Sequence, residues 1–252
     1  LFIVILGVIV FIHEFGHFTW AKITGVYVYE FAIGMGPKLF SKKGKETEYT
    51  IRAIPIGGFC QLAGEDLDED KANKVPKNMQ LQSKTPFQRF LIMVFGPVNN
   101  FVLAIVLLFF IALIWGGTTM NPVLSEVESG SVAEKTGLVA GDKIVEINGH
   151  KIKTNDDISL YLAMAKTNVK NKIKVEKKNG KVITYKIQPK KIKENGETYY
   201  RYGIIIEQEK THGLGAAFVY TYKKTCSIFK QMFITVGSLF TGGIKLKQLS
   251  GP

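Results

Sequence analysis

The sequence His13-Glu14-Phe15-Gly16-His17 combines residue types and a spacing that suit metal-dependent hydrolysis. Positions i and i+4 lie on one face of a helix, so the imidazoles of His13 and His17 can bind one ion together. Zinc favours imidazole nitrogens at about 2.0–2.1 Å in near-tetrahedral geometry. Glu14 can then act as the general base toward a water that the metal polarises, without being a ligand itself. The pattern therefore predicts Zn²⁺ as the cofactor, His13 and His17 as ligands and Glu14 as the catalytic residue.

These residues lie in an apolar stretch that is long enough to cross a membrane. Residues 1–22 would form a helix of about 33 Å, against a hydrocarbon core of about 30 Å. A cleaved signal peptide is the alternative, but the stretch has no basic leading region and no obvious small-residue cleavage site. Ionisable side chains inside a membrane helix are costly and are usually functional. We therefore expect the metal site to lie within the first transmembrane helix.

A second apolar stretch, residues 90–116, predicts a second transmembrane helix. Its first half is interrupted by Gly96-Pro97-Val98-Asn99-Asn100, where Pro97 should kink the helix. Asparagine amides at that depth need partners inside the protein. Two interpretations stand side by side: packing between helices, or a role in the active site.

The segments outside the two spans have different characters. Alternation of side-chain types over 47–54 predicts a β-hairpin near the membrane within the loop 23–89. Basic residues flank this loop at both ends, which predicts a cytoplasmic loop and an extracytoplasmic segment 117–207. Three lysines argue against a third span in 208–252, so we expect an amphipathic helix that lies on the membrane or against the helix bundle.

Residues 117–207 resemble a PDZ domain, an α+β module that binds extended peptides by strand addition. A strand-like run at 122–127 precedes Gly130-Ser131 and Gly137-Leu138, and Ile147-Asn148-Gly149 predicts a tight turn. We expect the walls of the peptide groove to be Val123 and Leu124 on the strand and Ile158 and Leu162 on the following helix. The alternative is that all four side chains belong to the core.

Four stretches together resemble the site-two protease family of intramembrane metalloproteases, in its bacterial single-PDZ form: His13–Pro37, Thr47–Phe59, Gly96–Phe101 and Lys245–Pro252. The resemblance implies that His13 and His17 bind zinc and that Glu14 is the general base. It also implies a third ligand, an aspartate within a later Asn-x-x-Pro…Leu-Asp-Gly pattern. The chain does not contain that pattern, and we expect a C-terminally truncated sequence.

The second and third of these stretches supply the residues that we expect to contact the substrate: Ile54, Gly57, Gly58 and Asn100. A hairpin with a purely structural role is the alternative for the first three of them. The acidic run at 65–70 is typical of a solvated loop, and Cys60 and Cys226 match no zinc or redox spacing.

The expected fold is a polytopic α-helical membrane protein with a membrane-associated β-hairpin and an inserted α+β PDZ domain. The expected function is a zinc metalloendopeptidase that cleaves transmembrane segments of pre-trimmed membrane proteins, such as anti-sigma factors or signal-peptide remnants. The alternative is a non-catalytic membrane scaffold that presents a PDZ module. The net charge of +12 comes from scattered lysines, which favours a lipid bilayer over nucleic acid as a partner. We expect a multi-pass protein of the bacterial cell membrane and leave its oligomeric state open.

Overall fold

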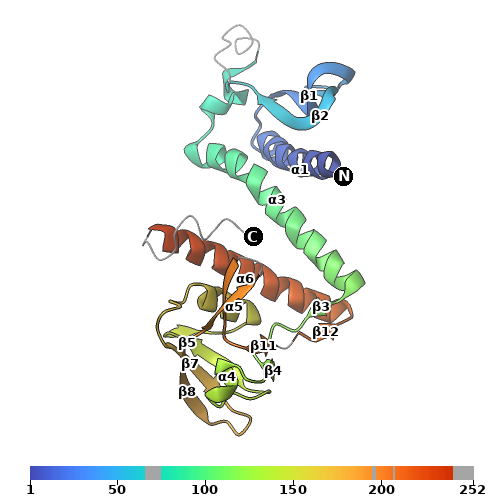
Figure 1. Cartoon of the computed structure of the whole chain (residues 1–252). Coiled ribbons are helices and arrows are strands. Elements are labelled where there is room, and N and C mark those ends of the chain that lie inside the picture. The colour runs from blue at the N-terminus through green and yellow to red at the C-terminus, as the bar shows by residue number, and fades with distance from the viewer. Residues whose placement is uncertain (66–74, 195–196, 207, 241–252) are drawn as a thin grey trace. The chain divides into compact units, whose positions relative to one another are not determined.

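The computed structural model describes residues 1–65, 75–194, 197–206 and 208–240 (Figure 1). It divides into two compact units, Leu1–Leu107 and Leu108–Pro252. Most of the acidic run at 65–70 and the whole family-like stretch Lys245–Pro252 lie outside the described residues.

The first unit contains two helices and a two-stranded antiparallel sheet. Its elements are α1 (Phe2–Ile23), β1 (Val28–Lys43), β2 (Glu48–Leu62), the short 3₁₀ helices Lys77–Met79 and Leu81–Ser83, and most of α3 (Pro86–Trp115). Among the described residues, α1 and α3 are the two helices that are long and apolar enough to cross a membrane. Little of either helix is buried within the protein. Lipid would cover the surface that both helices leave exposed.

Helices α1 and α3 approach each other closely at Gly16. A Cβ atom on this residue would lie 2.2 Å from the carbonyl oxygen of Phe95, so only glycine fits here. One turn further along α1, the ring of Trp20 packs on the ring of Phe95 with centroids 4.4 Å apart. Small residues allow membrane helices to pack backbone against backbone, and this contact brings the histidine face of α1 against α3.

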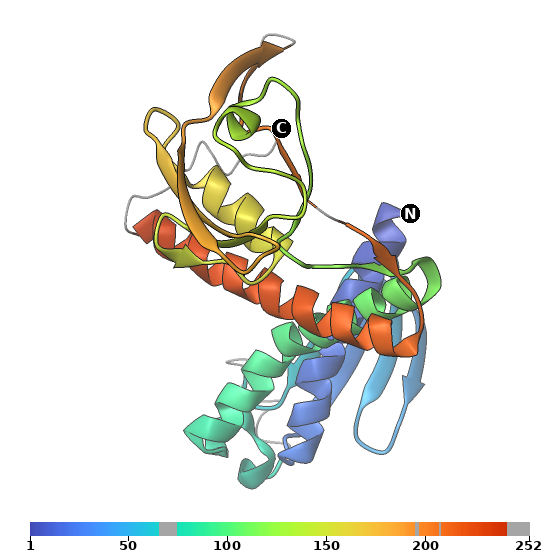
Figure 2. The ribbon, with the colours of Figure 1, turned by 90° about the horizontal axis from the view of Figure 1, so that it is seen from below.

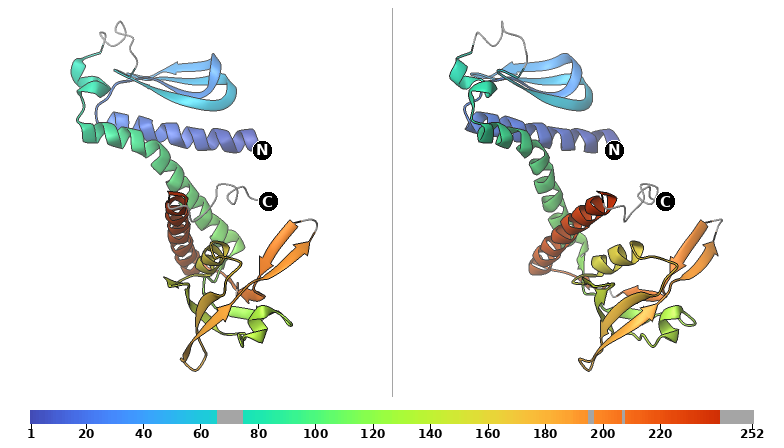
Figure 3. Two further views of the ribbon diagram at one scale, coloured as in Figure 1. Left: turned by 60° about the vertical axis from the view of Figure 1, so that its left-hand side comes forward. Right: turned by 90° about the vertical axis from the view of Figure 1, so that its left-hand side faces the viewer.

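Strands β1 and β2 pair along their whole length, with several shifts of register. Gly34 and Gly57 have φ values of +85° and +87°, which favour glycine at such irregular positions. A Cβ on Gly34 would lie 2.5 Å from the carbonyl oxygen of Ile54. The hairpin lies along α1 (Figure 3), and a buried cluster at its base joins it to both helices, formed by Ala21, Val26, Val28, Leu62, Leu81 and Ile92.

The second unit is an α+β body followed by a long helix. A four-stranded antiparallel sheet has the order β6-β5-β7-β8, and β4–β11, β9–β10 and β3–β12 form separate two-stranded ladders. The strands are β3 (Gly117–Thr118), β4 (Leu124–Val127), β5 (Lys143–Ile147), β6 (His150–Lys151), β7 (Asn171–Glu176), β8 (Val182–Ile187), β9 (Lys190–Glu194), β10 (Glu197–Arg201), β11 (Ile204–Ile206) and β12 (Lys210–Thr211). The helices are α4 (Val132–Lys135), α5 (Asn155–Ala163) and α6 (Leu214–Phe240). Alternate residues of β7, Ile173 and Val175, point into one core. This core also contains Ile144 and Ile147 of β5, Leu124, Leu138 and Ile158.

Helix α6 lies beside α5 (Figure 2). The carboxylate of Asp156 forms an ion pair with the ammonium of Lys224, with Nζ–O distances of 2.8 and 3.0 Å. The carboxylate of Asp157 forms an ion pair with Lys230 at 2.7 Å, and the side chain of Asp157 is only 2% exposed. A buried carboxylate needs such a partner, so these two ion pairs attach α6 to the body.

Candidate metal centre

The Nε2 atoms of His13 and His17 lie 3.2 Å apart on α1. Two nitrogens that bind one tetrahedral zinc ion at 2.0–2.1 Å are about 3.4 Å from each other. The helix therefore presents the pair of nitrogens at very nearly the separation that a shared zinc ion requires.

Gly96 of α3 leaves open the space that both nitrogens face. A Cβ atom on this residue would lie 2.3 Å from Nε2 of His17 and 3.0 Å from Nε2 of His13. Any larger residue would fill the position that a bound ion needs. The donor set and the open space fit a zinc ion.

A backbone carbonyl fixes the tautomer of His17. Its Nδ1 lies 2.8 Å from the carbonyl oxygen of Ile92, and because a carbonyl can only accept, Nδ1 carries the proton. Nε2 then has a free lone pair, as a metal ligand needs. Ile92 lies in the helical turn that leads to Pro97, whose ring crowds the carbonyl four residues before it and loosens the regular helix.

Asn100 lies against the other histidine, with its Nδ2 atom 3.3 Å from Nδ1 of His13. Its Oδ1 is buried and has no hydrogen-bond partner among the described residues. Turning the amide by 180° places Oδ1 beside His13, where it can accept a proton from Nδ1. That arrangement satisfies the buried oxygen and leaves Nε2 of His13 free to bind metal.

Replacing Asn100 with leucine is therefore expected to weaken zinc binding about 10–100-fold, because Nδ1 of His13 loses its partner. Zinc affinity of the purified protein, measured by competition with a chromophoric chelator, checks this. Asn99→Leu is the matched control, since the hydrogen bond that Asn99 makes within the described residues is a long one of 3.5 Å to the carbonyl of Ile12. Equal zinc affinities in the two variants would remove Asn100 from the metal centre.

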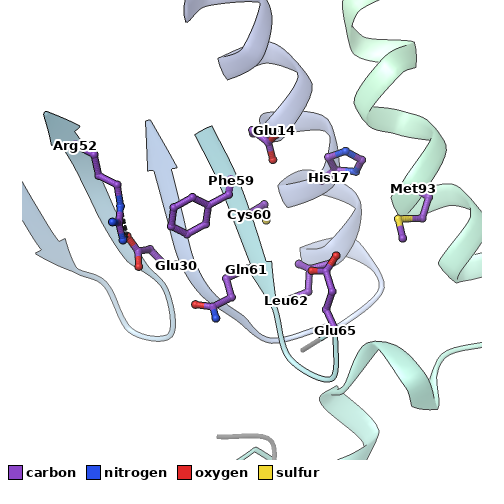
Figure 4. Close-up of a pocket in the computed structure, with 10 residues that line it drawn as sticks. All are labelled: Glu14, His17, Glu30, Arg52, Phe59, Cys60, Gln61, Leu62, Glu65 and Met93. Carbon is purple, nitrogen blue, oxygen red and sulfur yellow. Dashed lines mark hydrogen bonds and ion pairs between the residues drawn. The ribbon is translucent and has the colours of Figure 1, made fainter. Parts of the chain in front are cut away.

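Glu14 faces a cavity of about 620 Å³. Figure 4 shows Glu14 and His17 of α1 on one side of it, Phe59 and Cys60 of β2 on another, and Met93 of α3 opposite. The strand passes close to the carboxylate, since a Cβ on Gly58 would lie 3.4 Å from Cγ of Glu14. Burial, together with the nearby carboxylate of Glu14, raises the pKa of Cys60 to about 12. The thiol therefore stays protonated and is a poor nucleophile.

An ion pair between Glu30 and Arg52 lies on the wall of this cavity that the hairpin forms. The Glu30 carboxylate accepts hydrogen bonds from Arg52 at 2.7 Å and from Thr50 at 2.5 Å. Burial alone would raise the pKa of Glu30, but these hydrogen bonds outweigh it and the pKa is lowered. The guanidinium of Arg52 also lies 4.8 Å from the ring centre of Phe59. This pair gives the cavity a polar end on the hairpin side, and the sequence pattern did not indicate it.

The residues expected to contact the substrate occupy different places. Gly58 lies against Glu14, and Asn100 lies against His13. The backbone of Ile54 is close to Gly34, and its side chain is close to Gly36. Gly57 is close to the side chain of Met35. Neither Ile54 nor Gly57 lines the cavity around Glu14. Within the described part of the chain, no group of three or more His, Cys, Asp or Glu side chains is placed to hold a metal ion, so His13 and His17 are two candidate ligands without a third among the described residues.

A second cavity, of about 360 Å³, lies between α5 and β11. Ile158 and Leu162 line its helix side, and Ile204 and Ile206 line its strand side. Leu124 is 1% exposed in the core and lines neither wall. The strand wall of this cavity is therefore β11, where the sequence analysis expected Val123 and Leu124 to line a peptide groove.

Comparisons with known proteins agree with this chemistry. The model of the peptidase family M50 matches residues 1–252. A Clostridium perfringens protein whose name describes a zinc metalloprotease is 38% identical over 97% of this chain and 69% of its own length. The regulator of sigma-W protease RasP of Bacillus subtilis is 31% identical, with 100% of this chain and 76% of the relative covered. A Staphylococcus aureus relative, also named as a zinc metalloprotease, is 30% identical over 100% of this chain and 77% of its own length. With a family match over the whole chain and a paired-histidine centre at its start, the protein belongs to peptidase family M50, the site-two family of membrane metalloproteases.

Proposed function

We propose that the protein is an intramembrane zinc endopeptidase that cleaves transmembrane segments of membrane proteins already trimmed outside the membrane. Anti-sigma factors and signal-peptide remnants are the proposed substrates, in regulated intramembrane proteolysis. The observation that carries the proposal is the convergence of two imidazole nitrogens 3.2 Å apart, one of them from His17, which lines the same cavity as the Glu14 carboxylate. The relative RasP is named as a protease that regulates sigma-W, which supports this substrate class.

Each residue of the centre has a distinct part in the proposed reaction. His13 and His17 hold the ion, with an aspartate of a later segment as the third ligand. When bound, zinc supplies Lewis acidity that polarises water and the scissile carbonyl. Glu14 takes the proton of the attacking water and returns it to the departing amine. Ile92 and Asn100 keep the two imidazoles in the required tautomers.

The proposed role of β2 is to hold the substrate in an extended form. A transmembrane helix hides its peptide bonds in internal hydrogen bonds, so cleavage requires local unwinding. Pairing with a strand satisfies the groups that unwinding exposes. Gly57 and Gly58 precede the part of β2 that lines the cavity, and glycines let a second backbone come near.

The second unit is proposed to be a PDZ-like module that filters substrates. Its groove between α5 and β11 has an apolar floor and a strand along one wall, which suits an extended peptide. We propose that it faces the extracytoplasmic side and the hairpin the cytoplasm, following the distribution of basic residues around the spans.

Metal removal tests the proposed function. The purified protein, reconstituted with a model transmembrane substrate, is expected to lose cleavage after dialysis against a zinc chelator. Added Zn²⁺ should restore cleavage and Mg²⁺ should not, because magnesium prefers oxygen ligands over imidazole. His13→Ala serves as the control that zinc should fail to rescue. Cleavage that continues in metal-free protein would refute a zinc protease.

A further inference from the structure

A third cavity, of about 280 Å³, lies between the β3–β12 ladder and the first turns of α6. Its wall includes Thr118 and Thr119 from the chain after α3, Thr211 from β12, and Val219 and Lys223 from α6. It therefore combines hydroxyl groups, an apolar side chain and an ammonium group, and none of these belongs to the metal centre or to the peptide groove.

The cavity is tied to the end of a membrane-spanning helix. Helix α3 ends at Trp115, whose side chain is 64% exposed, and tryptophan is enriched at the boundary between lipid and water. The ladder begins two residues later, with Gly117 paired to Thr211. A Cβ on Gly117 would lie 2.7 Å from the ring of Tyr220. The first turns of α6 are thus packed against the end of α3, which puts the cavity at the level of lipid headgroups.

Among the residues that the structure describes, Lys223 is the lysine of α6 whose charge has no partner. Lys224 and Lys230 are held by Asp156 and Asp157. Within the described part of the chain, Lys223 makes no hydrogen bond or ion pair, and its side chain lines the cavity. An uncompensated ammonium group beside a membrane surface attracts anionic headgroups.

The same end of α6 has an apolar face. Phe218, Val219 and Tyr222 are between 55% and 72% exposed, and Phe218 packs on Phe109 of α3 at 4.6 Å between ring centres. This face is therefore continuous with the lipid-facing surface of α3, and acyl chains can cover both together.

We propose that this cavity binds the phosphate headgroup of an anionic phospholipid. The ammonium of Lys223 pairs with the phosphate, the hydroxyls of Thr118 and Thr211 donate hydrogen bonds to it, and the acyl chains lie along Phe218 and Val219. The lipid then holds the start of α6 at the membrane surface.

Trp115 provides a local probe for this site, because the chain has only two tryptophans. In the Trp20→Phe background, quenching of Trp115 by dibrominated phosphatidylglycerol is compared with quenching by dibrominated phosphatidylcholine in mixed vesicles. Lys223→Gln is expected to reduce the preference for phosphatidylglycerol about five-fold, the effect of one basic residue at an anionic surface. Thr118→Val should reduce it in the same direction.

Lys210→Gln is the matched control, since Lys210 is an exposed lysine of the same ladder that does not line the cavity. It should leave the preference unchanged. An equal drop in both lysine variants, or no drop in Lys223→Gln, would overturn the site. Millimolar inorganic phosphate that abolishes the preference would also overturn it, because the cavity would then be a simple anion site.

Discussion

Replacing Glu14 with glutamine is expected to lower the rate of peptide cleavage by about 10²–10⁴-fold while the zinc content stays the same. The amide keeps the shape of the carboxylate but cannot accept the proton of the attacking water. The residue faces the cavity and is not one of the paired nitrogens, so zinc binding should survive. Cleavage of a model transmembrane substrate by reconstituted protein gives the rate, and metal analysis of the same sample gives the zinc content.

Glu65→Gln is the matched control for this variant. Glu65 lines the same cavity, so its replacement removes a similar charge without removing the proposed base, and cleavage should change little. Wild-type rates in the zinc-loaded Glu14→Gln protein would end the catalytic assignment. Loss of zinc together with loss of activity would instead assign Glu14 to metal binding.

The Gly96→Ala variant is expected to lose zinc, with an affinity at least about 100-fold lower than that of the wild type. This exceeds the usual effect of a group beyond the ligands, because the new methyl carbon would occupy the ion's own space, 2.3 Å from Nε2 of His17. Chelator competition measures the affinity, and circular dichroism with thermal unfolding reports whether the helices remain intact.

Gly7→Ala is the control for Gly96→Ala. Gly7 also lies in a membrane helix, but a Cβ there would be 3.7 Å from its nearest neighbour, the carbonyl oxygen of Pro55, which is an ordinary contact. Zinc affinity should be unchanged in this variant. A folded Gly96→Ala protein that binds zinc normally would show that the space beside Gly96 is not where the ion is held.

The local patterns of the sequence account for much of the fold. The spacing of His13 and His17 defines one face of α1, and the alternation around Tyr49 and Ile51 indicates the strand β2. The apolar repeat of Phe218, Tyr222 and Phe229 indicates the amphipathic character of α6. In each case residues within one or two turns carry the information, because side-chain direction follows the period of the element.

Contacts between residues far apart in the sequence, such as those around His13 and His17, could not be predicted from these local patterns. Ile92 and His17 are 75 positions apart, and no periodicity connects a carbonyl on one helix to a ring on another. The sequence does mark Gly96 as the neighbour of a kinking proline, but only the packing of α3 on α1 makes it the residue that faces two imidazoles. Strand pairing is a contact of the same kind: β11 pairs with β4, and β11, not Val123 or Leu124, lines the second cavity.

The carboxylate of Asp157 connects the start of α5 to α6. One oxygen accepts the backbone N–H groups of Lys153 and Thr154 at the start of α5, and the other holds Lys230 of α6. The next residue, Ile158, forms part of the groove. A displacement at the beginning of α5 would therefore pull on α6 through the ion pairs of Asp156 and Asp157, and a shift of α6 would reshape the cavity beside Ile158 in return. The shape of the cavity between α5 and β11 and the position of α6 are in this way mechanically linked.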